Sequence, residues 1–329
     1  MNCAYITLLS SDIYIYYVLG LYNSWLKTKA IYPFYCVVTE EISQSVRNIL
    51  TQQQIPYIDL DTSDIGKILN KCKNLACNSA YIKASRKLKI FTLTQFDKCL
   101  YVDSDMLILE NIDDVFEKPM FTAVEDLCTS SLQNKMKYLN GMTSFNGGFF
   151  VFVPSMEYYD YLIQTVQSLP PLDPQIYRKN DKGIYSGWHD QSILAYCCKN
   201  WLKNKNLQLP IIYNFLVNTA NYRKYPHLLK KIKVKHFVGN KTNIINNQPV
   251  KYPDSLYQEW IDYLTFINNI IIQNKINLPL LNLELIEKPA EISEYPLWLR
   301  QIIKYYPKAS SDKIVAQWLK TQKKSKKSK

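Results

Sequence analysis

Short apolar runs alternate with helical patterns over the first part of the chain. The runs at residues 4–9, 34–38 and 56–60 have the length of buried strands, and helical patterns at residues 13–27 and 39–52 separate them. Because each helix returns the chain to the start of the next strand, this alternation favours a parallel, doubly wound α/β sheet. No Gly-x-Gly-x-x-Gly or Walker sequence follows the first run, which argues against a classical dinucleotide or P-loop site.

The rest of the chain carries further strand and helix patterns. We expect helices at residues 83–96, 155–169, 188–199 and 254–273, and strands at residues 99–109, 121–124, 145–153, 207–213 and 234–239. Residues 61–80 are polar and irregular, and loops are expected at residues 127–143 and 170–187. We expect one globular domain over residues 1–275, an appended helical segment over residues 276–320 and a disordered lysine-rich tail over residues 321–329.

An Asp-x-Asp triplet interrupts the apolar run of residues 99–109. Asp103 and Asp105 flank Ser104, with apolar residues on both sides. Carboxylates at i and i+2 project from one side of an extended backbone and repel each other unless a cation lies between them. Their hard oxygen atoms suit Mg²⁺ or Mn²⁺. The triplet alone therefore predicts either a metal site or a surface turn with two solvated aspartates.

Two of the eight glycines, Gly147 and Gly148, stand together near the start of the expected strand at residues 145–153. Adjacent glycines at this position permit a positive φ or a close approach of the backbone to a ligand. A β-bulge is the alternative interpretation. Both interpretations remain open from the local sequence.

The formal net charge is +12, and the tail at residues 321–329 contributes five lysines and no acid. A basic surface suits an anionic partner such as a nucleic acid, a membrane or a nucleotide phosphate, but it also describes a solvated surface with a disordered tail. No nucleic-acid-binding module is recognisable, so no specific nucleic-acid partner is expected. The apolar stretch at residues 13–26 is too short and too polar to span a bilayer.

Eight cysteines are scattered without a Cys-x-x-Cys pair, and only three histidines are present, which makes a structural zinc site improbable. No signal peptide is evident, so reduced cysteines in the cytoplasm are expected. The 26 tyrosines, together with frequent Asn, Ile and Lys, are typical of AT-rich genomes, including those of large DNA viruses. For a viral source, the expected location is the host cytoplasm.

Several ordered motifs together resemble the glycogenin-like branch of the family 8 glycosyltransferases, which includes the galactinol synthases. The resemblance covers about residues 3–241. It rests on Tyr5-Ile-Thr-Leu-Leu-Ser-Ser-Asp-Ile-Tyr14, Lys87-Leu88, Lys98-Cys-Leu-Tyr-Val-Asp-Ser-Asp-Met-Leu-Ile-Leu-Glu-Asn-Ile-Asp-Asp-Val-Phe116, Phe145-Asn-Gly-Gly-Phe-Phe-Val-Phe-Val-Pro154, His189-Asp-Gln191 and Val234-Lys-His-Phe-Val-Gly239.

This resemblance implies a GT-A fold, that is, a Rossmann-like mixed sheet flanked by helices. It also implies a UDP-sugar donor, with UDP-glucose as the expected one, a divalent metal (Mn²⁺ or Mg²⁺) and retention of configuration at the anomeric carbon. The acceptor could be a glycan, a polyol or a protein, and a homodimer is compatible with the resemblance. Alternatives are a galactinol-synthase-like or other hexosyltransferase and a catalytically inactive GT-A binding module.

The resemblance also implies roles for individual residues. Asp103, Asp105 and His236 would bind the metal. Lys87 would meet the donor phosphate or sugar, and Asp190 would lie nearest the reacting centre, so these two are the expected catalytic residues. The remaining expected contacts to the nucleotide sugar are Thr7, Leu8, Ser10, Ser11, Tyr14, Ser104, Asp126, Asn146, Gly147, Gln191, Gly239 and Lys241.

The chain departs from the family pattern at two of these positions. The family usually has Lys-Pro-Trp shortly after the histidine motif, whereas Lys241 stands one residue earlier and is not followed by Pro-Trp. Asn146-Gly147-Gly148 replaces the Asn-Ser-Gly of many glycogenins, which leaves the choice of sugar open. Tyr213, Tyr222 and Tyr225 stand near the position of the self-glucosylated tyrosine of glycogenins, but tyrosine is too abundant here to predict self-glucosylation.

Overall fold

The structure is a computed structural model that describes residues 1–71, 83–126, 145–169, 190–198, 201, 203–239, 241–252 and 254–287. The loops expected at residues 127–143 and 170–187 and the lysine-rich tail lie outside the described residues, as does most of the appended segment at residues 276–320. None of the helices in the described ranges combines the length and the hydropathy needed to cross a bilayer.

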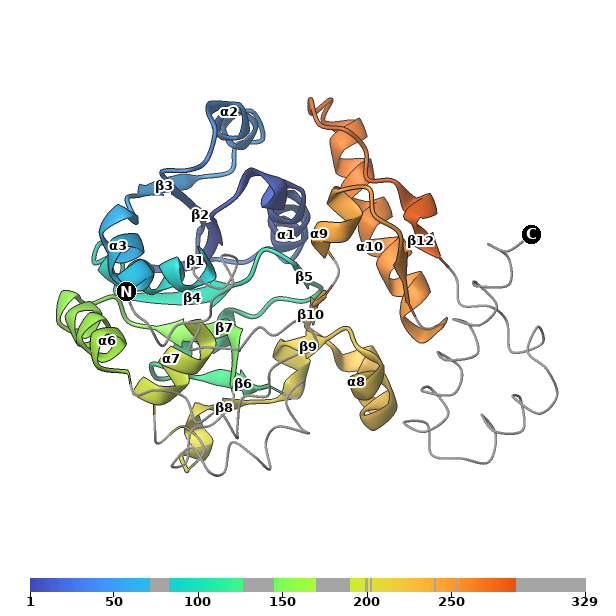
Figure 1. Ribbon diagram of the computed structural model, residues 1–329. Helices are drawn as coiled ribbons and strands as arrows, with labels where there is room; N and C mark the ends of the chain where they lie inside the picture. Colours follow the sequence, from blue (N-terminus) through green and yellow to red (C-terminus); the bar gives the residue numbers. More distant parts are fainter. Residues whose placement is uncertain are drawn as a thin grey trace, which may run out of the picture.

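A seven-stranded mixed sheet forms the centre of the molecule, in the order β3-β2-β1-β4-β7-β6-β8 (Figure 1). Its strands are β1 (Cys3–Leu9), β2 (Phe34–Thr39), β3 (Tyr57–Leu60), β4 (Lys98–Val102), β6 (Ala123–Glu125), β7 (Phe145–Phe152) and β8 (Gln208–Leu209). Strands β1 to β4 are parallel, whereas β7 runs antiparallel to both β4 and β6. The expected mixed α/β sheet is therefore present.

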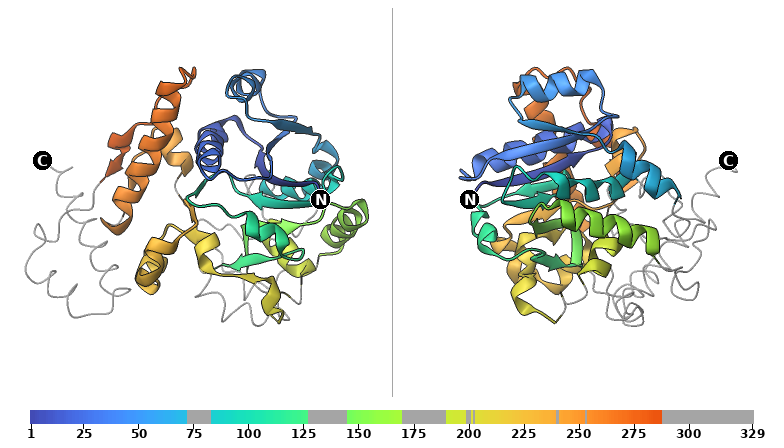
Figure 2. Two further views of the ribbon diagram at one scale, coloured as in Figure 1. Left: turned by 180° about the vertical axis from the view of Figure 1, so that it is seen from behind. Right: turned by 90° about the vertical axis from the view of Figure 1, so that its left-hand side faces the viewer.

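Helices cover both faces of this sheet because the side chains of a strand alternate between its two faces. In the described ranges the α-helices are α1 (Ile15–Lys27), α2 (Gln44–Gln52), α3 (Ser63–Lys71), α6 (Met156–Ser168), α7 (Asp190–Cys197), α8 (Thr219–Lys224), α9 (Lys241–Ile245) and α10 (Asp254–Gln273). Tyr5 and Leu9 of β1 belong to a core shared with α1, α2 and α10, whereas Ile6 and Leu8 belong to a core shared with α3, α6 and α7. Figure 2 shows α10 (orange) and α6 (green) on opposite sides of the sheet.

A small second sheet brings distant segments to the end of β4. It consists of β5 (Met106–Ile108), β10 (Val234–His236) and β9 (Phe215–Leu216), with β10 in the middle. Met106, directly after the Asp-x-Asp triplet, pairs with His236 in antiparallel register. This pairing places the triplet next to a histidine that lies far away in the sequence. A two-stranded sheet pairs β11 (Val250–Lys251) with β12 (Ile286–Glu287).

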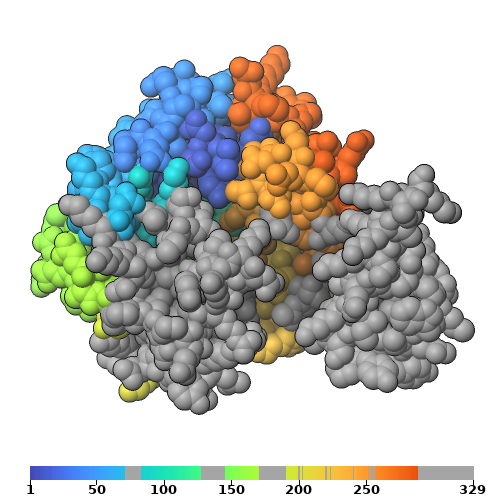
Figure 3. Space-filling view, in the orientation of Figure 1, coloured from blue at the N-terminus to red at the C-terminus, as the bar shows by residue number. Residues whose placement is uncertain are grey.

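The segment that follows β10 packs against the N-terminal part of the chain. Helix α1 contacts α10 closely, since a side chain added at Gly20 would lie only 3.1 Å from Ile267. The hydroxyl of Tyr17 donates a 3.0 Å hydrogen bond to the carbonyl of Lys241 at the start of α9. Figure 3 shows the corresponding blue and orange surfaces side by side.

Several expectations about secondary structure need correction. The strand expected at residues 99–109 is two strands of different sheets, β4 and β5, because the chain turns between them, where the N–H of Met106 donates to the carbonyl of Asp103. Residues 61–80, expected to be irregular, contain α3, whose Ile65 and Leu69 lie one turn apart and are buried. The strand expected at residues 207–213 is only the two-residue β8, because Pro210 lacks an N–H for the ladder and caps a 3₁₀ helix instead. The helix expected at residues 83–96 is largely 3₁₀, over Arg86–Thr92.

Short 3₁₀ helices connect many of these elements. Within the described residues they are η1 (Asp12–Tyr14), η2 (Arg86–Thr92), η3 (Asp113–Glu117), η5 (Lys205–Leu207), η6 (Ile211–Tyr213), η7 (Pro226–Lys231) and η8 (Leu283–Leu285).

Candidate functional site

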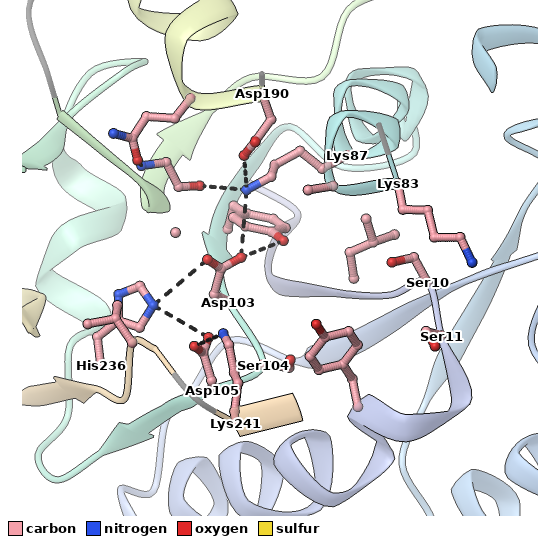
Figure 4. A pocket seen from close by; sticks show the side chains of 18 of the residues that line it. Ser10, Ser11, Lys83, Lys87, Asp103, Ser104, Asp105, Asp190, His236 and Lys241 are labelled. Atoms are coloured by element: carbon pink, nitrogen blue, oxygen red, sulfur yellow. Dashed lines mark hydrogen bonds and ion pairs between the residues drawn. The ribbon is translucent and has the colours of Figure 1, made fainter. Parts of the chain in front are cut away.

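A cavity of about 700 Å³ opens where β1 and β4 end and the second sheet begins (Figure 4). Most of the residues expected to contact a nucleotide sugar line this cavity, although they come from segments spread over the chain. They are Leu8, Ser10, Ser11, Tyr14, Lys87, Asp103, Ser104, Asp105, Asn146, Gly147, Asp190, Gln191, His236, Gly239 and Lys241. In Figure 4, Ser10 and Ser11 lie at one end of the group, away from His236.

Asp103, Asp105 and His236 form a cluster with metal-ligating geometry. One ligand atom from each residue lies within 4.8 Å of the others. The Nε2 atom of His236 is 3.4 Å from Oδ1 of Asp105 and 3.9 Å from Oδ2 of Asp103. Two carboxylates and one imidazole are a donor set that suits Mn²⁺. The chain's own side chains therefore fit the divalent metal that the resemblance implies.

Lys241 pairs with the more deeply buried of the two aspartates. Its ammonium group contacts Oδ2 of Asp105, whose side chain is only 2% exposed. Burial by itself would raise the pKa of Asp105, but the positive charge of Lys241 holds this pKa well below its usual range. Asp105 is therefore an anion at neutral pH, as a metal ligand must be.

Lys87 is a buried cation between two carboxylates. Its Nζ atom lies 2.6 Å from Oδ2 of Asp190 and 3.7 Å from Oδ1 of Asp103, and it donates to the carbonyl of Gly147 at 3.0 Å. Burial lowers the pKa of Lys87, but the charges of Asp103 and Asp190 outweigh this effect and raise it overall. Lys87 thus keeps a fixed positive charge at the wall of the cavity (Figure 4).

Thr7 and Asp126 are the two expected contact residues that do not line the cavity. Thr7 is fully buried in β1, where alternation points it away from the face on which Leu8 lies. Asp126 is buried behind Gln191, whose amide donates a 2.8 Å hydrogen bond to it. The same Gln191 side chain accepts a 2.9 Å hydrogen bond from the N–H of Gly147. Asp126 therefore contacts Gln191 rather than the cavity.

Both interpretations of the paired glycines find support in the structure. A Cβ at Gly148 would lie 2.5 Å from Oδ2 of Asp103 and 2.8 Å from Cε1 of His236, so the backbone approaches the acidic cluster too closely for a side chain. The pairing of β6 with β7 also shifts register opposite this segment. Neither glycine has a positive φ, which is instead found at Gly239, with φ of 111°.

Comparison with known families agrees with this geometry. The family model for glycosyl transferase family 8 matches residues 5–242. The chain belongs to glycosyl transferase family 8. Relatives include Glycogenin-1 of Caenorhabditis elegans, 28% identical over 249 residues that cover 73% of this chain and 50% of that protein. Galactinol synthase 1 of Solanum lycopersicum is 29% identical over 182 residues, which cover 52% of this chain and 56% of that protein.

The chain therefore spans about half the length of these family 8 relatives. Among solved structures, the apo WbbM bifunctional glycosyltransferase superimposes with a TM-score of 0.55 at 15% identity, covering 84% of this chain and 51% of that one. This likeness concerns the fold, and it confirms the expected GT-A architecture.

Tyr101 and Asn214 also contact side chains of this family 8 site, and neither was expected from the sequence. The hydroxyl of Tyr101 donates a 2.9 Å hydrogen bond to Oδ1 of Asp103, and the ring of Tyr101 lies 4.9 Å from Nζ of Lys87. Tyr101 precedes Asp103 by two residues, so the alternation of β4 could have indicated their shared side. Asn214 lies behind His236 and is 1% exposed. A single asparagine inside the apolar run of residues 213–217 was its only signal.

The hydroxyl of Tyr213 is not directed at the cavity. It donates to Asp114 and accepts a 3.1 Å hydrogen bond from Nζ of Lys233. Tyr213 does not line the cavity, whereas the side chain of the next residue, Asn214, contacts Asn146 and His236. Tyr213 is thus held away from the site within its own chain.

Proposed function

We propose that this chain is a metal-dependent retaining glycosyltransferase that moves a hexose from a UDP-sugar to an acceptor hydroxyl. The observation that carries the proposal is that two charged groups of residues adjoin at the wall of one cavity. One is the cluster of Asp103, Asp105 and His236, and the other is the pair of Lys87 and Asp190, with Nζ of Lys87 only 3.7 Å from Oδ1 of Asp103. Family membership and the GT-A fold support the same conclusion.

The residues present can handle the charges that such a reaction creates. When the bond between the anomeric carbon and the diphosphate breaks, its electron pair stays on the diphosphate. Mn²⁺ held by Asp103, Asp105 and His236 would supply Lewis acidity to this leaving group. The buried ammonium of Lys87 provides a second, permanently positive group at the same cavity.

Asp190 acts on the sugar side of the breaking bond, at the anomeric carbon. The anomeric carbon becomes positively charged as the diphosphate leaves, and a nearby carboxylate stabilises that charge. Asp190 begins α7 and faces the cavity with its carboxylate 2.6 Å from Lys87. The pairing with Lys87 orients the carboxylate of Asp190. The acceptor oxygen then forms the new bond to the anomeric carbon, and its proton passes to the departing diphosphate.

The donor is proposed to be UDP-glucose, and the acceptor is unassigned. Leu8, Ser10, Ser11 and Tyr14 provide one end of the cavity with a mixed apolar and polar wall that suits a base and ribose. A galactinol-synthase-like hexosyltransferase with a polyol acceptor is the second candidate, since a galactinol synthase is among the relatives. A screen of UDP-glucose and UDP-galactose against polyols and glycans separates these two candidates.

Hydrolysis of UDP-sugars tests the enzymatic proposal without an acceptor. We expect the purified chain to release UDP from UDP-glucose with Mn²⁺ and to lose this activity with a chelator or in the Asp103→Ala variant. If wild type and Asp103→Ala are equally inert while both bind UDP, the chain is a binding module and not an enzyme. The mass of the protein after incubation with UDP-glucose tests self-glycosylation, which would add whole hexose units.

A further inference from the structure

The side-chain amide of Asn214 links two residues that line the cavity, Asn146 and His236. Its Nδ2 atom lies 2.9 Å from Oδ1 of Asn146, and its Oδ1 atom lies 2.9 Å from Nδ1 of His236. We infer that Asn214 is a positioning residue with two effects. It directs the lone pair of Nε2 of His236 toward the two aspartates of the metal cluster, and it directs the amide N–H groups of Asn146 toward the sugar. The relevance of this role to catalysis rests on the proposed function, but the role itself can be tested without activity.

The direction of these hydrogen bonds follows from the backbone of Gly148. Its N–H group lies 3.0 Å from one terminal atom of the Asn146 side chain. A backbone N–H can only donate, so the atom that receives it is the amide oxygen of Asn146. This fixes which way the Asn146 amide is turned.

The orientation of Asn214 follows in turn. The same oxygen of Asn146 can accept a second hydrogen bond but cannot donate, so the Asn214 atom next to it is the amide nitrogen. The amide oxygen of Asn214 must then face the imidazole of His236. Because Asn214 is 1% exposed, no bulk solvent competes for either end of its side chain.

The proton of a neutral His236 ring is therefore assigned to Nδ1. An oxygen of Asn214 accepts there, so Nδ1 carries the hydrogen and Nε2 keeps its lone pair. Nε2 is the atom that lies 3.4 Å from Asp105 and 3.9 Å from Asp103. A metal-ligating histidine needs this tautomer, and a fixed hydrogen bond at its other nitrogen is the usual means of securing it.

Asn146, the second hydrogen-bond partner of Asn214, faces the cavity. With its oxygen held by Gly148 and Asn214, Asn146 has two N–H donors remaining, and its side chain lines the cavity. Amide donors suit the hydroxyl oxygens of a sugar. The buried amide of Asn214 thus orients both a metal ligand, His236, and a residue expected to contact the sugar, Asn146.

The first test is the tautomer of His236 in the metal-free protein. The chain has three histidines, so ¹⁵N-histidine labelling gives three rings, and the variants His189→Gln and His227→Gln assign them by elimination. With the imidazole neutral, we expect the Nδ1–H form at His236 in the wild type and a mixture or the Nε2–H form in Asn214→Leu. An Nε2–H form in the wild type would overturn the inference.

The second test is Mn²⁺ affinity, measured by electron paramagnetic resonance. Asn214→Leu should weaken Mn²⁺ binding by about 10- to 100-fold, as loss of a partner behind a ligand typically does. The matched control is Asn268→Leu, which removes another buried amide, one bonded to both backbone groups of Leu281. It should lower stability without changing Mn²⁺ affinity. A folded Asn214→Leu protein with wild-type affinity and tautomer would contradict the inference.

The variant Asn214→Asp separates the two roles and remains informative if Asn214→Leu fails to fold. Its carboxylate still accepts from Nδ1 of His236 but cannot donate to Asn146. We expect the Nδ1–H tautomer and Mn²⁺ binding no weaker than in the wild type, together with weaker binding of UDP-glucose and unchanged binding of UDP. Weakened Mn²⁺ binding in this variant would refute the assignment, whereas an inactive wild type with these binding results would overturn only the proposed function.

Discussion

Lys241 and Asp105 form an ion pair inside the acidic cluster, although they lie far apart in the sequence. The ammonium group contacts Oδ2 of Asp105, whereas Nε2 of His236 lies 3.4 Å from Oδ1 of the same carboxylate. Lys241 and Mn²⁺ would therefore compete for the negative charge of Asp105, and a bound diphosphate would offer Lys241 another partner.

We expect Lys241→Met to bind Mn²⁺ more tightly than the wild type when no nucleotide is present. Loss of one nearby positive charge is worth ~1–4 kcal/mol between the dielectric of water and that of a protein surface, so the affinity for Mn²⁺ should rise by at least about fivefold. Affinity for UDP should fall in the same variant. Lys89→Met, which removes the partner of Asp64 outside the cavity, is the control. Equal or weaker Mn²⁺ binding by Lys241→Met would show that the pair does not compete with the metal.

Gly148→Ala should damage the metal site through steric contact. The added Cβ would meet Oδ2 of Asp103 at 2.5 Å, and overpacking of this kind costs ~1–3 kcal/mol, which predicts roughly 5- to 150-fold weaker Mn²⁺ binding. Gly147→Ala is the paired control, because its Cβ would meet Gln191 at 3.0 Å and no ligand of the cluster. Titration of both variants with Mn²⁺ decides the matter, and equal affinities would contradict the prediction.

Lys87→Met should reduce turnover more than donor binding. The buried ammonium contacts Asp190 and faces the charge that develops on the leaving diphosphate, so kcat should fall by about 10²–10³, as on removal of a preorganised electrostatic group. The control is Lys83→Met, at the same cavity but with a side chain that is 47% exposed. Steady-state kinetics with UDP-glucose gives both values. A kcat of Lys87→Met within tenfold of wild type would exclude this role.

Glu40→Gln should change the pH dependence of stability. Burial by itself raises the pKa of Glu40, but hydrogen bonds from Thr62 and the charge of Arg86 lower it below its ordinary value. A lowered pKa in the folded state means that the carboxylate stabilises the fold above the unfolded pKa of about 4.3 and loses this effect as the pH falls through the folded value.

The glutamine variant should therefore be less stable than wild type at pH 7, by under about 1 kcal/mol because the carboxylate is partly exposed to solvent. The difference should shrink toward zero near pH 3. Urea unfolding of both proteins at the two pH values measures it. A difference of the same size at both values would mean that the charge of Glu40 does not contribute.

The sequence carried enough information to predict those parts of the site that are local. Asp103 and Asp105 stand in one triplet after a recognisable strand, and the alternation of strands and helices predicted the parallel half of the sheet. His236 was accessible only through the resemblance to a family, because nothing in its own surroundings distinguishes it from a core histidine.

The remaining features depend on tertiary contacts that no local pattern reveals. Asn214 is a single polar residue in an apolar run, and only the pairing of β9 with β10 brings it behind His236. The contact of Lys241 with Asp105 depends on the turn after β10 rather than on either neighbouring sequence. Helix α3 was missed because Ile65 and Leu69 are buried but most of the surrounding sequence is polar, which gave no clear helical pattern.

The backbones of the two aspartates of the triplet, Asp103 and Asp105, are hydrogen-bonded to different sheets. The N–H of Asp103 donates to the carbonyl of Gly148 in β7, and the carbonyl of Asp105 accepts from the N–H of Phe237 just after β10. A complete ligand set therefore exists only when both sheets are formed and joined. During synthesis, a nascent chain that has folded β1 to β4 but has not yet added residue 236 would lack the site altogether. Capture of the metal would then mark the completion of folding, so that a half-made chain could not bind it.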